Sequence, residues 1–484
     1  MPLLLKSFCY ILLSALLASC KPSPNFAGAN GRDGGDISGA KNELIFVTHA
    51  GPTTYYIDGN SQLAGIEYDL ATLFVNEFAP EYRIKFLLVN SISDVVPSLL
   101  KGRADIAAAN LSITPLRKKL VQFATPYQET QQQLVFNNEV DVKPKNINAL
   151  VNRTISVPAG TSFAERLNQL QQAQLSDDLP AFKWKALNKT NSESLLEEVA
   201  SAVTDFTVAD SHLIAVMQNY YPSLSVGMAL GEPEKIAWAL PKNADPLLVK
   251  KVNAFFAEIK KDGRLRNLVD RYYGSSKRLN TLDITTFLKR TNSLLPQYKH
   301  LFKQAQELTG LDWRMLAAVS YRESHWDTFN TSPTNVRGLM MLTESTADLM
   351  GVTDRLDPKQ SIPAGAKYIL KLKETIPDKV PEPDRTYMAL AAYNIGYAHV
   401  EDARVLAQRQ GLNPNSWADL KKTLVMLNNP EYYTTVKYGY ASGGAPVIFV
   451  ESIRSYQRIL ERYQPSHNPG FDAFKIAQNG VEFY

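Results

Sequence analysis

Near residue 277 the hydrophobic pattern of the chain changes, and the kind of fold it can form changes with it. Upstream, from Glu43, short strand-like apolar runs alternate with stretches that have helical spacing. This alternation predicts an α/β fold with a mostly parallel sheet over residues 43–277. Downstream, the spacing is almost entirely helical, which predicts a mainly α domain over residues 278–484. A chain of 484 residues is long enough for both.

The α/β half contains two successive series of alternating elements. We expect its strands at residues 44–48, 83–89, 104–109, 121–123, 133–136, 154–157, 182–185, 204–209 and 236–240. We expect helices at residues 67–78, 95–101, after 160–161, at 194–201 and as one long helix over 246–272. In the second half, helices are expected at residues 283–291, 298–309 and 310–326.

The first 42 residues have the composition of a targeting segment and a tether. Residues 1–19 combine one lysine, an apolar run and small residues, which is typical of a cleaved signal peptide. The sequence Leu17-Ala-Ser-Cys20 resembles the bacterial lipobox, so we expect lipid on Cys20 and a polar tether over residues 20–42. Lys21 favours the periplasmic face of the outer membrane. The alternative is an ordinary cleaved signal in which Cys20 is coincidental.

Composition narrows the class of partner. The chain is 45% hydrophobic and 21% charged, with a net charge of +4 and no polybasic run. This does not favour nucleic acid, but it suits a polyanionic wall or a membrane surface. We also expect no metal ion and no cofactor.

A set of motifs in the α/β half occurs in a characteristic order. The motifs are Gly65-Ile-Glu-Tyr-Asp-Leu70, Lys101-Gly-Arg-Ala-Asp-Ile106, Ser112-Ile-Thr-Pro-Leu-Arg117, Phe123-Ala-Thr-Pro-Tyr127, Val157-Pro-Ala-Gly-Thr-Ser162 and Val208-Ala-Asp210. In this order they resemble the family 3 extracellular solute-binding proteins. The resemblance implies a two-lobed periplasmic-binding-protein-like domain with a cleft for polar amino acids.

Four residues of these motifs have the chemistry of an amino-acid site. Arg117 offers a two-pronged donor to a carboxylate. Thr161 and Ser162 open a helix after a glycine and offer backbone donors at its positive end. Asp210 follows a buried strand and suits an ammonium group. An amino acid or a murein stem peptide is the expected ligand, and the domain is expected to be regulatory. The alternative is a purely structural cleft, with Arg117 solvated and Thr161 only a helix cap.

In the helical half, one helix carries a carboxylate at its end. In Gly310–Trp326, the residues Leu311, Met315, Val319 and Glu323 fall on one helical face. Burial on that face would favour the protonated carboxyl that a general acid needs. The alternative is that Glu323 lies at the edge of the face and is either solvated or paired with Arg322 or His325.

Three further motifs follow Glu323-Ser324 in order. They are Gly338-Leu-Met-Met-Leu342, Ala391-Ala-Tyr-Asn394 and Phe449-Val450 at the start of a final helix. As a set they resemble the family 1 lytic transglycosylases, whose fold is goose-lysozyme-like. Two positions depart from that pattern, because Met341 stands where many relatives have Gln and Phe449 replaces a Tyr.

The resemblance implies a peptidoglycan lytic transglycosylase, a lyase that cleaves glycan strands between N-acetylmuramic acid and N-acetylglucosamine. Glu323 would be the catalytic acid and then the base that helps the sugar's own 6-hydroxyl form a 1,6-anhydro end. Ser324, Met340, Met341, Tyr393 and Asn394 would contact the substrate. Two alternatives remain at this stage: a muramidase that hydrolyses the bond with water, and a non-catalytic binding lipoprotein.

Overall fold

The computed structural model describes residues 42–58, 62–151, 153–177, 181–276, 278–332 and 335–468. The expected signal peptide, the lipidation of Cys20, nearly all of the tether and the boundary residue Lys277 lie outside these ranges. Within them, no helix combines the length and the apolar character needed to cross a membrane.

The first lobe of the α/β domain is built on a five-stranded sheet in the order β4-β1-β5-β14-β6. The strands β1, β4 and β5 are parallel, whereas β14 runs antiparallel to both of its neighbours. The strands are β1 (Glu43–His49), β4 (Arg83–Val89), β5 (Ile106–Ala107), β6 (Val121–Phe123) and β14 (Ala239–Pro241). The helices of this lobe are α1 (Ile66–Phe78), α2 (Val95–Leu100), α3 (Pro115–Leu120), α7 (Pro246–Lys261) and α8 (Arg264–Tyr273).

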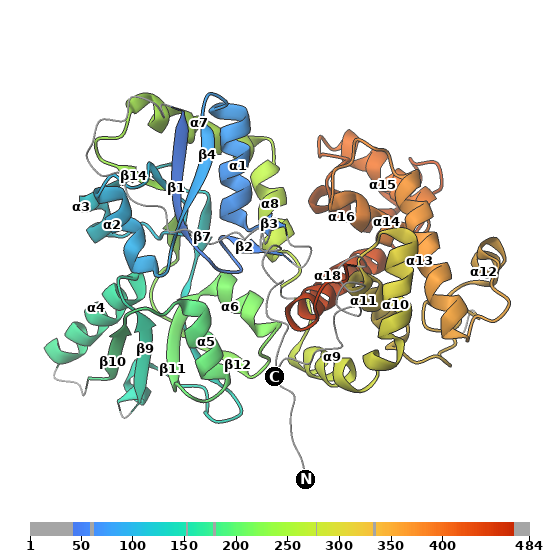
Figure 1. Ribbon diagram of the computed structural model, residues 1–484, viewed down its shortest axis with the longest axis horizontal. Helices are drawn as coiled ribbons and strands as arrows, with labels where there is room; N and C mark the ends of the chain where they lie inside the picture. The colour runs from blue at the N-terminus through green and yellow to red at the C-terminus, as the bar shows by residue number, and fades with distance from the viewer. Residues whose placement is uncertain are drawn as a thin grey trace, which may run out of the picture. The chain divides into compact units, whose positions relative to one another are not determined.

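The second lobe has its own five-stranded sheet, in the order β10-β9-β11-β8-β12. Figure 1 labels four of these strands, β9, β10, β11 and β12. Here β8 runs antiparallel to both β11 and β12. The strands are β8 (Gln132–Asn137), β9 (Thr154–Pro158), β10 (Lys183–Leu187), β11 (Phe206–Asp210) and β12 (Leu224–Ala229). The helices are α4 (Ser162–Ser176), α5 (Ser192–Ala200) and α6 (Ser211–Gln218). Two-stranded ribbons are formed by β2 (Tyr56–Ile57) with β3 (Leu63–Ala64), and by β7 (Gln128–Thr130) with β13 (Glu234–Ile236).

Two expectations for this half need correction. Both sheets are mixed, because the chain passes between lobes through strands that pair in the antiparallel sense. The single long helix expected over residues 246–272 is two helices, α7 and α8. Gly263 separates them with a φ of 87°, a left-handed conformation that glycine adopts without steric cost.

The second half is helical, as the sequence predicts: in the described part of residues 278–468 no β-strand occurs. Its helices are α9 (Thr281–Ser293), α10 (Leu295–Thr309), α11 (Trp313–Ser324), α12 (Glu344–Met350), α13 (Pro358–Thr375), α14 (Asp384–Ile395), α15 (Tyr397–Arg409), α16 (Trp417–Leu424), α17 (Pro430–Tyr433) and α18 (Gly444–Tyr463).

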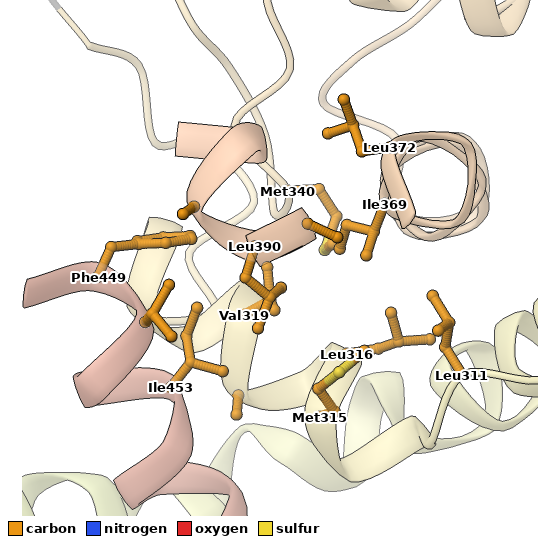
Figure 2. Close-up of a cluster of buried hydrophobic side chains, with 14 of the residues drawn as sticks. Leu311, Met315, Leu316, Val319, Met340, Ile369, Leu372, Leu390, Phe449 and Ile453 are labelled. Carbon is orange, nitrogen blue, oxygen red and sulfur yellow. The ribbon is translucent and has the colours of Figure 1, made fainter. Parts of the chain in front are cut away.

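The helix α11 lies at the centre of this domain and packs against α10 and α18. Every residue from Trp313 to Tyr321 is buried, so α11 is enclosed on all sides rather than on one face. Figure 2 shows Leu316 and Val319 of α11 in one cluster with Leu390 of α14 and Ile453 of α18. A helix held this firmly is a rigid support for a functional group at its end.

Candidate active site

Glu323 is the penultimate residue of α11, at the point where the helix leaves the core. Asp312 caps the start of the helix, and its side chain accepts a hydrogen bond from the Arg314 backbone N–H at 2.7 Å. It ends at His325, which adopts a left-handed conformation with a φ of 55°. The chain therefore turns sharply just after Glu323, which is half-buried, like Arg322 before it, whereas residues 313–321 are buried.

Burial raises the pKa of Glu323 to about 7, and the nearby Arg322 guanidinium opposes this shift. The two causes are burial and a cation, and neither of them is a second carboxylate. Asp327, Glu344 and Asp348, the acidic residues nearby in sequence, are all exposed. The site therefore offers one carboxyl that is about half protonated near neutral pH.

The serine after Glu323, Ser324, contacts the turn at residues 338–341. The Ser324 hydroxyl lies 3.0 Å from the Leu339 carbonyl oxygen and 3.0 Å from that of Ser320. The Ser320 hydroxyl donates to the same Leu339 oxygen at 3.0 Å. Ser324 is 1% exposed. The structure thus departs from the expectation that Ser324 contacts substrate, because its hydroxyl is buried against backbone carbonyls.

Tyr393 joins this turn from α14. Its hydroxyl donates to the Met340 carbonyl oxygen at 2.6 Å. Its ring lies parallel to that of Phe449 on α18, with centroids 6.5 Å apart. Burial and the charge of Glu323 together raise the pKa of Tyr393 well above its usual value, so the hydroxyl stays protonated. The motifs around residues 323, 340, 393 and 449 are therefore brought together.

The two methionines of the turn have different surroundings. Met340 is 0% exposed and packs against Gly365, where an added Cβ would lie 2.7 Å from its terminal methyl group. Figure 2 shows Met340 in the core beside Leu390 and Ile369. Its side chain therefore does not line a groove, contrary to expectation. Met341 is partly exposed and has a φ of 48°, a conformation that is uncommon for residues other than glycine.

Asn394 is exposed, one residue beyond Tyr393 near the end of α14. Its amide is positioned where a ligand can reach it. Of the predicted substrate contacts, Asn394, Met341 and Tyr393 keep accessible surface, and Tyr393 is close enough to feel the charge of Glu323. Ser324 and Met340 are buried and support the turn from inside. The sequence did not point to Ser320, and it indicated Arg322 only as a possible partner of Glu323. The guanidinium of Arg322 lies 5.9 Å from the Phe449 ring centroid.

In the α/β domain, the four predicted cleft residues line one cavity of about 40 Å³. Arg117 is 6% exposed and donates to the Ser112 carbonyl oxygen at 3.0 Å and to that of Gly160 at 3.3 Å. Since Gly160 belongs to the second lobe, the latter bond joins the lobes. Arg117 is thus buried at the cavity, which excludes the alternative of a solvated surface arginine.

The remaining three residues come from the second lobe. Thr161 precedes α4 and its hydroxyl donates to the Pro158 carbonyl oxygen at 2.7 Å, so its side chain is not a helix cap. Ser162 opens α4, and its hydroxyl is 2.9 Å from the Gln132 amide nitrogen. Burial raises the pKa of Asp210 to about 7, with a further rise from the Glu234 charge. The cavity also has polar walls that the sequence did not indicate: His49, Asn110, Glu193 and His212.

Comparisons with known proteins agree with both halves. Residues 44–275 match the model of bacterial extracellular solute-binding proteins, family 3, and residues 300–415 match the transglycosylase SLT domain. An ancestral arginine-binding protein bound to arginine is similar over 49% of this chain and 100% of its own, with 24% identity and a TM-score of 0.42.

Curated relatives cover almost the whole chain. A membrane-bound lytic murein transglycosylase F from Methylobacillus flagellatus is 57% identical over 466 residues, which is 96% of each chain. The protein of the same name from Nitrosospira multiformis is 44% identical over 429 residues, covering 89% of this chain and 88% of the relative. The chain therefore belongs to the membrane-bound lytic murein transglycosylase F family and is a murein-degrading lytic transglycosylase with a solute-binding-protein-like domain in front.

Proposed function

We propose that Glu323 alone provides the acid and base chemistry of murein cleavage. In the first step, the Glu323 carboxyl gives its proton to the glycosidic oxygen as the bond from that oxygen to C1 of the muramoyl sugar breaks. The sugar's acetamido oxygen supports the positive charge that develops at C1. The supporting observation is the pKa of about 7, which leaves a protonated carboxyl available near neutral pH.

In the second step, the 6-hydroxyl of the same sugar attacks C1 and gives its proton to the Glu323 carboxylate. This closes the 1,6-anhydro ring, returns Glu323 to its protonated form and consumes no water. A nucleophilic enzyme carboxylate would have to lie about 5 Å from the acid, and its charge would raise the pKa of the acid further. The pKa shift of Glu323 is caused by burial and opposed by Arg322, and no second carboxylate contributes to it. This supports a mechanism with one carboxyl.

The neighbouring residues have two kinds of role in this proposal. Tyr393, Asn394 and Met341 contact the sugar in this proposal, because each belongs to a motif of the site and keeps accessible surface. Ser324 and Met340 are positioning residues, which hold the turn through the Leu339 and Met340 carbonyl oxygens. In the absence of Gln at position 341, the contact there is apolar.

Mass spectrometry of murein sacculi digested by the full chain tests this function. We expect products that end in 1,6-anhydromuramic acid, which are lighter by one water than reducing ends. Reducing ends would instead identify a hydrolytic muramidase. A Glu323→Gln variant is expected to produce neither, and retention of cleavage by this variant would refute both mechanisms.

For the front domain, residues 43–277, we propose an amino-acid or stem-peptide site. Arg117 would bind the ligand carboxylate together with the backbone donors at the start of α4, and Asp210 would bind its ammonium group. Support comes from the meeting of these groups at one buried cavity. We also propose that ligand binding regulates the helical domain, residues 278–484. The test compares murein turnover with and without added ligand, in the wild type and in the Arg117→Ala variant. Turnover that does not change with ligand in the wild type would contradict this regulation.

For localisation, we propose a lipid anchor on Cys20 that holds the protein at the periplasmic face of the outer membrane. The sequence Leu17-Ala-Ser-Cys20 supports this. Metabolic labelling with a radioactive fatty acid, followed by membrane fractionation, tests it. We expect label in the outer-membrane fraction, and no label in a Cys20→Ala variant.

A further inference from the structure

The loop between α17 and α18, residues 434–443, presents two tyrosine rings to solvent. Tyr438 is 49% exposed and Tyr440 is 63% exposed. A third ring, that of Tyr433 at the end of α17, meets the Tyr440 ring edge to face, with centroids 5.7 Å apart. Single exposed apolar side chains are common on protein surfaces, so their exposure alone indicates nothing. The way this tyrosine loop is held and its place beside the candidate active site are more informative.

A buried carboxylate holds the tyrosine loop in one conformation. Asp402 of α15 is 2% exposed, and its two oxygens accept hydrogen bonds from the backbone N–H groups of Lys437, Tyr438 and Gly439 at 3.1, 2.9 and 3.1 Å. A carboxylate is costly to bury, and donors from three successive residues compensate that cost. The loop backbone is therefore fixed at Tyr438 itself.

Both ends of the tyrosine loop are fixed as well. Arg409, the last residue of α15, donates to the Thr435 carbonyl oxygen at 3.0 Å and to the Thr435 hydroxyl at 3.1 Å. At the other end, the Gly443 N–H donates to the Asn428 side-chain oxygen at 2.9 Å. A Cβ at Gly443 would lie 1.6 Å from the Leu424 carbonyl oxygen, so this close approach requires glycine. Aromatic rings on a rigid backbone lose little conformational freedom when they bind a ligand, which favours a binding role.

One link places the tyrosine loop beside Asn394. Tyr397, the first residue of α15, follows Asn394 by three residues, which span at most about 11 Å. The pKa of Tyr397 is raised by burial, by the neighbouring Glu401 and, to a smaller extent, by Tyr438. Because charges in proteins interact strongly only over short distances, the side chains of Tyr397 and Tyr438 lie near each other.

A second link comes from α18. This helix begins at Gly444, directly after the tyrosine loop, and its residue Phe449 stacks on Tyr393. Tyr393 in turn is near enough to Glu323 for the charge of Glu323 to raise its pKa. The loop therefore continues the surface formed by the motif residues on α14 and α18, on the side of Asn394.

The chemistry of the exposed rings suits a sugar. One face of a pyranose ring consists of C–H groups and packs on a flat aromatic ring, whereas the hydroxyl and acetamido groups at its edge need polar partners. Tyrosine offers both, an apolar face and a polar tip. The ammonium group of the exposed Lys437 lies 5.0 Å from the Tyr438 ring centroid, which adds a positive charge suited to anionic murein.

We propose that Tyr438 and Tyr440 form a further saccharide subsite, which binds the glycan strand beyond the two sugars joined by the cleaved bond. This inference rests on the proposed reaction at Glu323, because it extends the substrate-binding surface from there past Asn394. The two rings hold the strand and take no part in bond cleavage. Long strands therefore bind more tightly than short ones, and they lose this advantage when the rings are removed.

Isothermal titration calorimetry with the full-length Glu323→Gln chain tests this subsite, because the variant is expected to bind glycan without cleaving it. The probes are two peptide-free murein oligosaccharides, which contain two and four repeats of N-acetylglucosamine and N-acetylmuramic acid. We expect the longer probe to bind about tenfold more tightly, an effect of the size given by stacking on two aromatic rings. Adding Tyr438→Ala and Tyr440→Ala together should make the two affinities equal.

Two control variants in the same Glu323→Gln background make the test specific. The pair Tyr438→Phe and Tyr440→Phe keeps the rings and should keep most of the length preference. Leu308→Ala removes an exposed apolar side chain, 59% exposed, near the end of α10. Since Leu308 lies just before the start of α11 and Glu323 near its end, this variant should keep the full preference.

The remaining outcomes decide against the subsite. A length preference that survives the loss of both rings would refute it, and so would equal affinities for the two probes, or binding of neither, before the rings are removed. Circular dichroism checks that the alanine pair folds, and Tyr440→Ala alone replaces the pair if it does not. The mechanism at Glu323 is tested separately by the 1,6-anhydro ends that the wild type produces, because these ends depend on what attacks C1 and not on how the distant sugars are held.

Discussion

The Glu323→Gln substitution should stabilise the protein at alkaline pH while it abolishes cleavage. In the folded chain the pKa of Glu323 is about 7, compared with 4.5 for a glutamate in water. Between these two values the folded state holds a proton that the unfolded state has lost. The free energy of unfolding therefore falls as pH rises from about 4.5 to 7, by roughly 3 kcal/mol in total at about 1.4 kcal/mol per pKa unit.

Glutamine carries no ionisable group and removes this penalty. Differential scanning calorimetry at pH 5 and pH 8 measures the effect, with the transition of the helical domain followed in the full chain. At pH 8, the roughly 3 kcal/mol corresponds to an increase in Tm of about 6 °C or more for a domain of this size. At pH 5, where Glu323 is protonated in the folded protein, the two proteins should differ little.

Glu344→Gln is the matched control, because Glu344 is an exposed carboxylate on α12 of the same domain. It should change neither the Tm difference nor cleavage. An increase in Tm of Glu323→Gln that is the same at both pH values would show that burial does not govern this carboxyl. The reasoning on which its acid role rests would then fail.

Three further predictions concern the same domain. The rate of murein cleavage, kcat/KM, should fall above about pH 7 as Glu323 ionises, without a second acidic limb from another carboxylate; a bell-shaped profile with a limb near pH 4 would indicate two carboxyls. Tyr393→Phe should lower the stability by about 1 kcal/mol in urea unfolding and reduce cleavage, because it removes the 2.6 Å bond to the Met340 carbonyl oxygen. Ser324→Ala should cost a similar amount of stability and leave KM for murein unchanged, since its hydroxyl is buried; a raised KM would restore it as a substrate contact.

The patterns of apolar residues predicted the positions of the helices and strands better than the directions of the strands within their sheets. The strands at residues 43–49 and 83–89 and the helices around Glu323 lie close to the expected positions. Strand direction is set by which partner a strand meets, and β14 joins its sheet only after the chain has built the second lobe. The alternation of strands and helices along the sequence does not show which strands pair in space.

At the site, the sequence located the motifs but could not show which of their side chains are buried and which are accessible to a ligand. Met340 and Met341 are neighbours of the same type, yet the turn buries one and leaves the other partly exposed. Met340 packs against Gly365 of α13, whereas Met341 has a left-handed conformation, and neither feature leaves a pattern in the local sequence. Glu193 was missed for a related reason. An acidic residue in the first turn of a helix is the ordinary sequence choice there.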